Sequence, residues 1–426
     1  MSFHSLRLCL TTVLMSMLVA ACGGGDAGSA PPPTDLVVTA GNGQVTMQWT
    51  PVAGVEYWVM YAPTNQPINI KSPPGVHYWL NNVTSPLVIP GLTNGQPYSF
   101  AMNARVNGGK GGTQTPSITK TPRLGGNTWS PGLGLDSGKD FRGLAYGAAA
   151  DNTLDYIAVG SGGAIFKSRY VNTDNVLTWS SAASGLSVDF NAATYASGKF
   201  IAVGSGTSNN VVSSADLLNW APASTAIATR LNAVATDGVT VVAVGDGGKI
   251  YRTTDGLTWN DVSASGINDH LQGVSYLSSG NWVAVGSNGA LLLSSDGTSW
   301  SRSTATLPVS LRTATLRSVA AVGATWVIVG DAGAVMTSTN SGANWTDYSS
   351  SIVGFPNFYA VNGSSTTYSS LTQFLIVGAS GAVYSSPNGT AWTQQAAGIT
   401  DDLYGLLGSA TQYFAVGAAG TSYTSK

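Results

Sequence analysis

One pattern recurs along most of this 426-residue chain: a short run of apolar and β-branched residues that ends on Val-Gly, followed by a turn that contains a further glycine. The seven copies of this pattern end on Val159-Gly160, Val203-Gly204, Val244-Gly245, Val285-Gly286, Val329-Gly330, Val377-Gly378 and Val416-Gly417. This recurrence constrains the fold more than any other feature, because one small structural unit must account for every copy.

Residues 231–261 show the repeated unit in full. The unit contains four β-rich runs, at residues 231–235, 239–244, 249–253 and in the segment that ends on Trp259. Turns that contain glycine, such as Asp237-Gly238 and Asp255-Gly256, separate these runs. Four runs joined by short turns of this kind predict a four-stranded antiparallel meander.

A tryptophan follows each of the first six copies, as Trp179, Trp220, Trp259, Trp300, Trp345 and Trp392. The chain ends at Lys426 before a fourth run can follow the last copy, and Trp129 stands ahead of the first copy instead. Four-stranded units that recur roughly every 40 to 45 residues predict a β-propeller. We therefore expect an all-β fold in which residues 127–426 form a seven-bladed β-propeller. The N-terminal strand at Thr128-Trp129 would complete its last blade and remove the open edge.

The first residues have the pattern of a secretion signal over residues 1–21, with an apolar run over residues 8–17 that is too short to span a membrane. Leu18-Val19-Ala20-Ala21-Cys22 resembles the lipobox of bacterial lipoproteins, which implies a lipid anchor on Cys22. Gly23, where an aspartate would resemble a retention signal of the inner membrane, favours the outer membrane, facing either the periplasm or the outside. An ordinary signal peptide followed by a chance cysteine is the alternative.

Residues 22–33 form a predicted linker, and residues 34–122 a separate domain. Alternating runs at residues 44–49, 57–61, 87–89 and 98–106 predict a small β-sandwich. The segment resembles a fibronectin type III module, with Trp49 at the core position of the second strand and Tyr98 in the tyrosine corner. This resemblance implies that the Tyr98 hydroxyl bonds to backbone. Residues 63–74 depart from the pattern because they are rich in proline.

Several turns ahead of the tryptophans resemble the Asp-box of sialidases and their relatives. The clearest contain Asp255 and Asp296, and asparagine replaces the aspartate at Asn340 and Asn388. The turn at Asp216 has no glycine, so we expect it to be looser. An aspartate at this place bonds its own turn, and the repetition favours a structural role over a catalytic or calcium-binding one.

The ring as a whole resembles the neuraminidase-repeat propellers, including those of photosystem II assembly factors. Phe141-Arg142 resembles the start of the sialidase motif whose arginine holds a carboxylate, but Gly143-Leu144 follows where Ile-Pro belongs. Sialidases also need a glutamate, and Glu56, in the sandwich, is the only glutamate of the chain. A glycoside hydrolase that uses Asp140 or the pair Asp401-Asp402 stays open as an alternative.

Composition excludes some classes of partner. Charged residues make up 9% of the chain and the formal net charge is −2, so no basic stripe is present to hold nucleic acid. Only His77 and His270 remain after the signal segment, so we expect no His/Cys metal site and no cofactor. With Cys9 removed, one cysteine remains and no internal disulfide can form. A Ca²⁺ site made of loop oxygens stays open.

One polar position recurs directly after the first apolar residue of each repeat. Its occupants are Arg142, Asn191, Asn232, Gln272, Arg317, Tyr359 and Tyr404. The residue before that apolar position is ionisable in five repeats, as Asp140, Asp189, Arg230, His270 and Asp402. We expect the seven side chains to line a wet channel mouth that binds a ligand, with Arg142 and Arg317 as anchors for a carboxylate or sulfate. The alternative is that they only solvate the rim of an empty channel.

These features predict a non-catalytic lipoprotein of the cell envelope that binds a protein or glycan partner through propeller loops, in a binding, assembly or adhesion role. Its contact with the membrane would be the lipid anchor alone. The alternative function is a carbohydrate-active enzyme, a glycoside hydrolase of sialidase-like fold.

Overall fold

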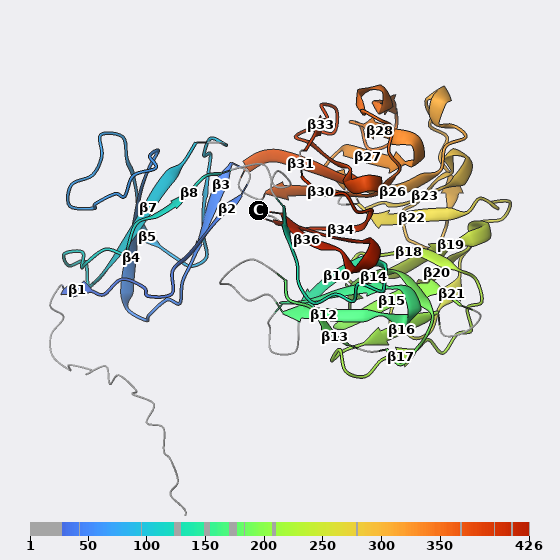
Figure 1. Cartoon of the computed structure of the whole chain (residues 1–426), viewed down its shortest axis with the longest axis horizontal. Coiled ribbons are helices and arrows are strands. Elements are labelled where there is room, and N and C mark those ends of the chain that lie inside the picture. Colours follow the sequence, from blue (N-terminus) through green and yellow to red (C-terminus); the bar gives the residue numbers. More distant parts are fainter. Residues whose placement is uncertain are drawn as a thin grey trace, which may run out of the picture.

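The structure is a computed structural model that describes residues 28–41, 43–94, 96–122, 129–148, 154–169, 177–182, 184–206, 210–277, 280–366, 369–395, 397–409 and 412–425. The predicted signal segment, Cys22 and the start of the linker lie outside these residues. Strands and short 3-10 turns form the secondary structure (Figure 1). Within the described ranges, no helix is long and apolar enough to cross a membrane.

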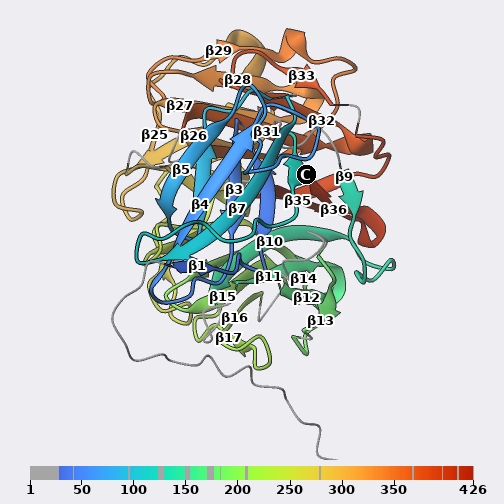
Figure 2. The same cartoon turned by 90° about the vertical axis from the view of Figure 1, so that its left-hand side faces the viewer.

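The N-terminal part of the described chain is a sandwich of two antiparallel sheets. One sheet contains β2 (Val37–Gly41), β3 (Gln44–Gln48) and β6 (Leu87–Pro90), and the other contains β4 (Val55–Ala62), β5 (Tyr78–Val83), β7 (Tyr98–Val106), β1 (Gly28–Ala30) and β8 (Ile118–Lys120). Figure 2 shows β4, β5 and β7 side by side. Met47, Val59 and Phe100 have no exposed surface and lie in the core between the sheets.

Two details of the sandwich agree with the motifs of its sequence. Trp49 is buried, and its ring packs against Tyr57 with the ring centroids 5.4 Å apart. The Tyr98 hydroxyl accepts a hydrogen bond from the backbone N–H of Thr93 at 3.2 Å. This bond holds the chain at the point where it enters β7.

The structure changes the predicted boundary of the linker. Gly28–Ala30 is not linker but strand β1, which pairs with the end of β7 at Ala104, Arg105 and Val106. Strand β8 pairs with the other end of β7, from Tyr98 to Phe100. Because β8 does not reach the end of β7 near Ala104, that part of the edge would be open without β1. Composition suggested a flexible segment here, but backbone pairing to an available edge does not depend on side chains.

The rest of the described chain forms seven four-stranded antiparallel sheets. The first four sheets are β10 (Phe141–Ala148), β11 (Leu154–Gly160), β12 (Ile165–Arg169), β13 (Ser180–Ser181); β14 (Asp189–Ala196), β15 (Lys199–Ser205), β16 (Val211–Ser214), β17 (Ala221–Pro222); β18 (Leu231–Thr236), β19 (Val241–Gly245), β20 (Ile250–Thr253), β21 (Asn260–Asp261); and β22 (Leu271–Tyr276), β23 (Trp282–Gly286), β24 (Leu291–Ser294), β25 (Ser301–Arg302). The other three are β26 (Leu316–Val322), β27 (Thr325–Gly330), β28 (Val335–Ser338), β29 (Thr346–Asp347); β30 (Phe358–Thr366), β31 (Ser369–Gly378), β32 (Val383–Ser386), β33 (Thr393–Gln394); and β34 (Leu403–Ser409), β35 (Gln412–Gly417), β36 (Ser422–Ser425), β9 (Trp129–Pro131).

The sheets follow one another around a circle (Figure 1). The first strand of each sheet contacts the first strand of the next, and β34 of the last sheet contacts β10 of the first. Strand β9 supplies the fourth strand of the last sheet, where Trp129 pairs with Ser425 and Ser130 with Thr424. A strand from before the first repeat therefore lies beside the last strand of the chain.

The recurrent Val-Gly dipeptide ends or nearly ends the second strand of each sheet, and the glycine is needed because two backbone segments approach there. A Cβ atom added to Gly245 would lie 2.0 Å from the carbonyl oxygen of Arg230. The backbone of Gly245 is extended, with φ at −160°, so conformational freedom is not the reason. The same carbonyl accepts the N–H of Asp246 at 3.1 Å. Any other residue at this place would separate the strands.

The six tryptophans that follow the Val-Gly copies stand directly before the short fourth strands, whereas Trp129 is the first residue of β9. These rings pack between sheets. Trp259 precedes β21 and is buried in a cluster with Ile201 and Val203 of the preceding sheet. Each such ring therefore belongs to the interface between neighbouring sheets.

The Asp-box turns are held by bonds to their own backbone. Asp255 Oδ1 accepts the N–H groups of Thr258 at 2.8 Å and Leu257 at 2.7 Å, and these bonds lower the pKa of Asp255 to about 2. Asp296 makes the equivalent bonds, with its pKa also lowered to about 2. Asn388 makes equivalent bonds without a charge, to the N–H groups two and three residues later.

The expectation of a looser turn at Asp216 is wrong. Asp216 Oδ1 accepts the N–H groups of Leu218 and Asn219 at 2.9 and 2.8 Å, as in the turns that contain glycine. Leu217 takes the place of the glycine with φ at +58°. The Leu217 side chain is buried against the neighbouring sheet, and this burial offsets the strain of the left-handed conformation.

Replacing both Asp255 and Asp296 by asparagine should keep these turns, because Asn340 and Asn388 already occupy the same place in two other sheets. The depressed pKa values mean that the ionised carboxylates stabilise the fold above the unfolded pKa of 3.8, and that this stabilisation is lost as the pH falls toward 2. Melting temperatures measured between about pH 5 and pH 2 should therefore fall less steeply for the variant than for the parent. Parallel curves would contradict this account.

Candidate functional site

Each of the seven predicted site residues is the extra residue of a β-bulge. In the first sheet, Phe141 pairs with Gly160 and Gly143 with Val159, which leaves Arg142 without a partner in the ladder. The same interruption of register occurs at Asn191, Asn232, Gln272, Arg317, Tyr359 and Tyr404. A bulge bends its strand and changes the direction of the extra side chain. The sequence predicted the position but not the bulge.

The residue after each bulge is small, which lets the first strands approach one another. These residues are Gly143, Ala192, Ala233, Gly273, Ser318, Ala360 and Gly405. A Cβ atom on Gly273 would lie 2.5 Å from the carbonyl oxygen of Arg317, and one on Gly405 would lie 2.8 Å from that of Arg142. Each bulge therefore lies next to the bulge of the neighbouring sheet.

Three of the seven side chains form one contiguous group. The Arg317 guanidinium lies 5.5 Å from the ring centroid of Tyr359, and the rings of Tyr359 and Tyr404 are 5.2 Å apart. Burial is the largest cause that raises the pKa of Tyr404, and together with the nearby carboxylates of Asp402 and Asp140 it brings this pKa to about 12. The Tyr404 phenol therefore stays protonated at neutral pH, as a hydrogen-bond donor and not as a nucleophile.

The two arginines differ in how firmly they are held. Asp331 binds Arg317 through both carboxylate oxygens, with Arg317 Nη2 at 3.0 Å from Oδ2. Arg142 has only longer contacts, 3.5 Å to Asp189 and 3.8 Å to Asp140. Because Asp331 already binds two nitrogens of the Arg317 guanidinium, the Arg142 guanidinium is more accessible to a ligand.

Two of the predicted binding residues connect neighbouring sheets. Asn191 Nδ2 donates to the carbonyl oxygen of Leu231 at 2.8 Å, and Asn232 Nδ2 donates to that of Leu271, also at 2.8 Å. The Asn191 side chain is buried, with 9% of the residue's surface exposed. These amides satisfy backbone carbonyls of the adjacent first strand, so their role in the structure is to join sheets.

The aspartates ahead of the first strands bond to turns of the neighbouring sheet. Asp189 accepts the N–H of Gly162 at 2.8 Å, and Asp402 accepts that of Ser380 at 2.7 Å. Asp140 accepts the N–H of Ala419 at 3.2 Å, which joins the first sheet to the last. Each of these three aspartates therefore fixes a turn of an adjacent sheet. Such bonds hold the carboxylates in place while leaving part of each side chain exposed.

The group around the bulges has mixed charge with an acidic excess. Five carboxylates, from Asp140, Asp189, Asp246, Asp331 and Asp402, lie in contact with site residues or their immediate neighbours. The basic groups that accompany them are Arg142, Arg230, Arg317 and His270. This arrangement suits a ligand that carries both a cationic and an anionic group better than a simple anion.

The single glutamate of the sequence has structural partners. Glu56 binds Arg105 at 2.7 Å and the N–H of Gly108 at 3.2 Å, within the sandwich. Among the described residues, no group of three or more His, Cys, Asp or Glu side chains could hold a metal ion.

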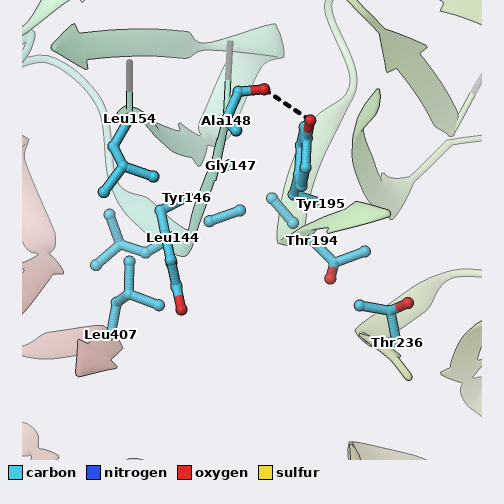
Figure 3. A pocket seen from close by; sticks show the side chains of 11 residues that line it. Leu144, Tyr146, Gly147, Ala148, Leu154, Thr194, Tyr195, Thr236 and Leu407 are labelled. Atoms are coloured by element: carbon cyan, nitrogen blue, oxygen red, sulfur yellow. Dashed lines mark hydrogen bonds between the residues drawn. The ribbon is translucent and has the colours of Figure 1, made fainter. Parts of the chain in front are cut away.

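Sequence reasoning missed a pocket toward the other ends of the same first strands. It lies among β10, β14, β18 and β34, and Tyr146, Tyr195 and Leu407 are among the residues that line it (Figure 3). The sequence contained one sign of this pocket, at the fifth residue after the first apolar residue of each repeat. That residue is tyrosine in only three of the seven repeats, so it does not stand out as a repeated feature.

No protein-family model and no curated protein sequence matches the chain. Solved structures do match it. YCF48 bound to a D1 peptide has a TM-score of 0.54 at 17% identity, covering 70% of this chain and 94% of that one. Virginiamycin B lyase from Staphylococcus aureus has a TM-score of 0.56 at 10% identity, covering 70% and 99%. The WD40 propeller domain of Doa1 has a TM-score of 0.51 at 10% identity, covering 70% and 95%. Identities this low show the fold, a β-propeller, and not the function.

Replacing Asn191 by alanine should destabilise the ring, because the carbonyl of Leu231 loses its donor in a buried place. The expected loss is about 1–3 kcal/mol in the free energy of unfolding, measured by urea titration. Gln272→Ala, at the same position of another sheet and only partly buried, is the matched control and should change little. Equal effects of the two substitutions would contradict the role assigned to Asn191.

Proposed function

We propose that this chain is a lipoprotein of the bacterial cell envelope that binds a segment of a partner protein, without catalysis, at the group of side chains on the seven bulges. The observation that supports this most is the contiguous set of Arg317, Tyr359 and Tyr404, with Arg142 and exposed carboxylates beside it. Aromatic rings and a loosely held guanidinium are frequent anchors in protein recognition.

The chemistry of the group fits a peptide. Asp189 and Asp140 are partly exposed and can accept a basic side chain or an N-terminal amine, while Arg142 can hold a carboxylate. The Tyr404 phenol can donate to a peptide carbonyl, because its raised pKa keeps it protonated. The solved YCF48 structure with its D1 peptide supports the choice of a protein segment, since its fold is similar.

The proposal includes a finer architecture. The seven sheets act as the seven blades of one propeller, which β9 closes by pairing with β36. The sandwich acts as a fibronectin type III module, which the two-sheet arrangement and the bond to Tyr98 support. Cys22 carries the lipid, and the module holds the propeller away from the outer membrane.

The binding role is tested by replacing Arg142 and Arg317 with alanine together. The double variant, prepared in soluble form with Cys22→Ser, should lose capture of the partner protein from cell-envelope extracts. Capture should then be reproduced with the purified partner. The matched control replaces Arg169 and Arg302, which also pair with aspartates but lie away from the bulges. The control should capture as the parent does.

Several results would contradict the binding proposal. Equal capture by the two double variants would place the binding face elsewhere. Turnover of chromogenic glycosides by the parent would favour the carbohydrate-active enzyme instead. Retention on a glycan array without protein capture would replace the protein partner with a glycan.

The anchor is tested separately. Cys22→Ser should move the protein from the membrane fraction to the soluble fraction, because the acylated cysteine and not the fold holds it there. The fractions are compared by immunoblotting. Unchanged membrane fractionation would mean that the lipobox interpretation is mistaken.

A further inference from the structure

The pocket shown in Figure 3 lies away from the bulges, among the first strands of four sheets. Its volume is about 500 Å³, and its lining includes Leu144, Tyr146, Leu154, Thr194 and Leu407. Figure 3 shows Tyr146 and the three leucines on one side of a space, with Thr194, Tyr195 and Thr236 on the other side. Pockets that hold small organic molecules have volumes of this order.

Among the described residues that line this pocket, none has a charged side chain. The residues around the pocket are leucines, alanines, glycine, threonines and tyrosines. A charged ligand would lose its hydration there without gaining a counter-ion, whereas a neutral one would not. The pocket therefore differs in chemistry from the acid-rich group at the bulges of the same strands.

The two tyrosines of the pocket are held differently. The Tyr195 hydroxyl donates to the carbonyl oxygen of Ala148 at 2.7 Å, and its ring lies so close to Gly147 that an added Cβ atom would come within 2.2 Å of it. Tyr146 packs against Tyr156, with ring centroids 6.0 Å apart and planes inclined by 27°, yet remains 46% exposed. Tyr195 is therefore held in place at the side of the pocket, and Tyr146 exposes its ring to the pocket.

The tyrosines are not part of the repeat. The equivalent position along the seven first strands holds Tyr146, Tyr195, Thr236, Tyr276, Ala321, Gly363 and Gly408 in order. A position that only supported the fold would need one type of side chain in every sheet. The large rings gather instead on one side of the circle of sheets, and the pocket lies where two of them meet the leucines of β10, β11 and β34.

We propose that this pocket binds a small neutral organic molecule with a flat aromatic ring. The ring stacks on Tyr146, and Leu144, Leu154 and Leu407 contact its edges. The uncharged lining selects against ionised ligands of the same shape. This site is separate from the proposed protein-binding group and does not depend on it.

The test uses three probes on the soluble Cys22→Ser chain, with binding measured by ligand-observed NMR titration. Indole, which is neutral and aromatic, should bind at least about tenfold more tightly than indole-3-acetate, because the acetate brings an unpaired charge. Methyl β-glucoside, which is neutral but not aromatic, should bind more weakly than indole. Tighter binding of the glucoside would replace the aromatic ligand by a sugar and overturn the proposal.

Substitutions locate the site. Tyr146→Ala should weaken indole binding about tenfold, and Tyr146→Phe should preserve it, because the ring and not the hydroxyl carries the contact. Tyr276→Ala is the matched control, since Tyr276 occupies the equivalent position of β22, is 37% exposed and contacts the ring of Trp282 with the centroids 5.0 Å apart. Equal loss in Tyr146→Ala and Tyr276→Ala, or no indole binding to the parent at millimolar concentration, would overturn the proposal.

A gain-of-function variant completes the test. Leu154 is 42% exposed, so a lysine there can keep its ammonium in water and place it beside the pocket. Leu154→Lys should raise the affinity for indole-3-acetate several-fold while leaving indole little changed. Improved binding of both probes, or of neither, would contradict the position assigned to the ligand.

Discussion

The close approach between the recurrent glycine and the start of the first strand underlies the rest of the ring. At Gly417, an added Cβ atom would lie 1.8 Å from the carbonyl oxygen of Asp402, and the other six glycines have the same relation to their partners. The glycine pairs with the apolar residue that begins the first strand, and the bulge follows directly after that pair. A side chain on the glycine would move the strand and with it the bulged residue. The residue type with no side chain therefore determines where the side chains of the candidate site are displayed.

Two positions hold different residue types among the seven copies of one backbone arrangement, while every sheet keeps the same topology. The bulged residue is one, and the residue four places later, close to the other end of the strand, is the second. Selection for stability alone would give both positions a single residue type, as it does for the valine and glycine of the second strand. Arg142 and Tyr146 lie on the same strand, β10, yet belong to groups of opposite character, one charged and one uncharged. The ring thus offers two chemically distinct surfaces on one scaffold.

Much of the fold could be predicted from the sequence because it depends on local patterns. The alternation of the strands, the turns at Asp255 and Asp296 and the pairing of Trp129 with the last sheet all follow from the repeat. The features that were missed depend on contacts between distant residues. The turn at Asp216 keeps its geometry because Leu217 is buried against a neighbouring sheet. Gly28–Ala30 forms a strand because an edge of β7 is available to it. Neither condition is visible in the sequence near those residues.

The free energy with which each arginine could bind a ligand also depends on contacts that the sequence does not show. In the sequence, Arg142 and Arg317 look alike, because both follow the first apolar residue of a repeat. A ligand carboxylate at Arg317 has to displace Asp331, so the exchange replaces one bidentate pair by another and contributes little net free energy. At Arg142 the existing contacts are longer and half-exposed, and such pairs stabilise the free protein by at most about 1 kcal/mol. A ligand can replace them at small loss. Selectivity for a partner should therefore come from Arg142 and the tyrosines, while Arg317 mainly holds the face of Tyr359 in position.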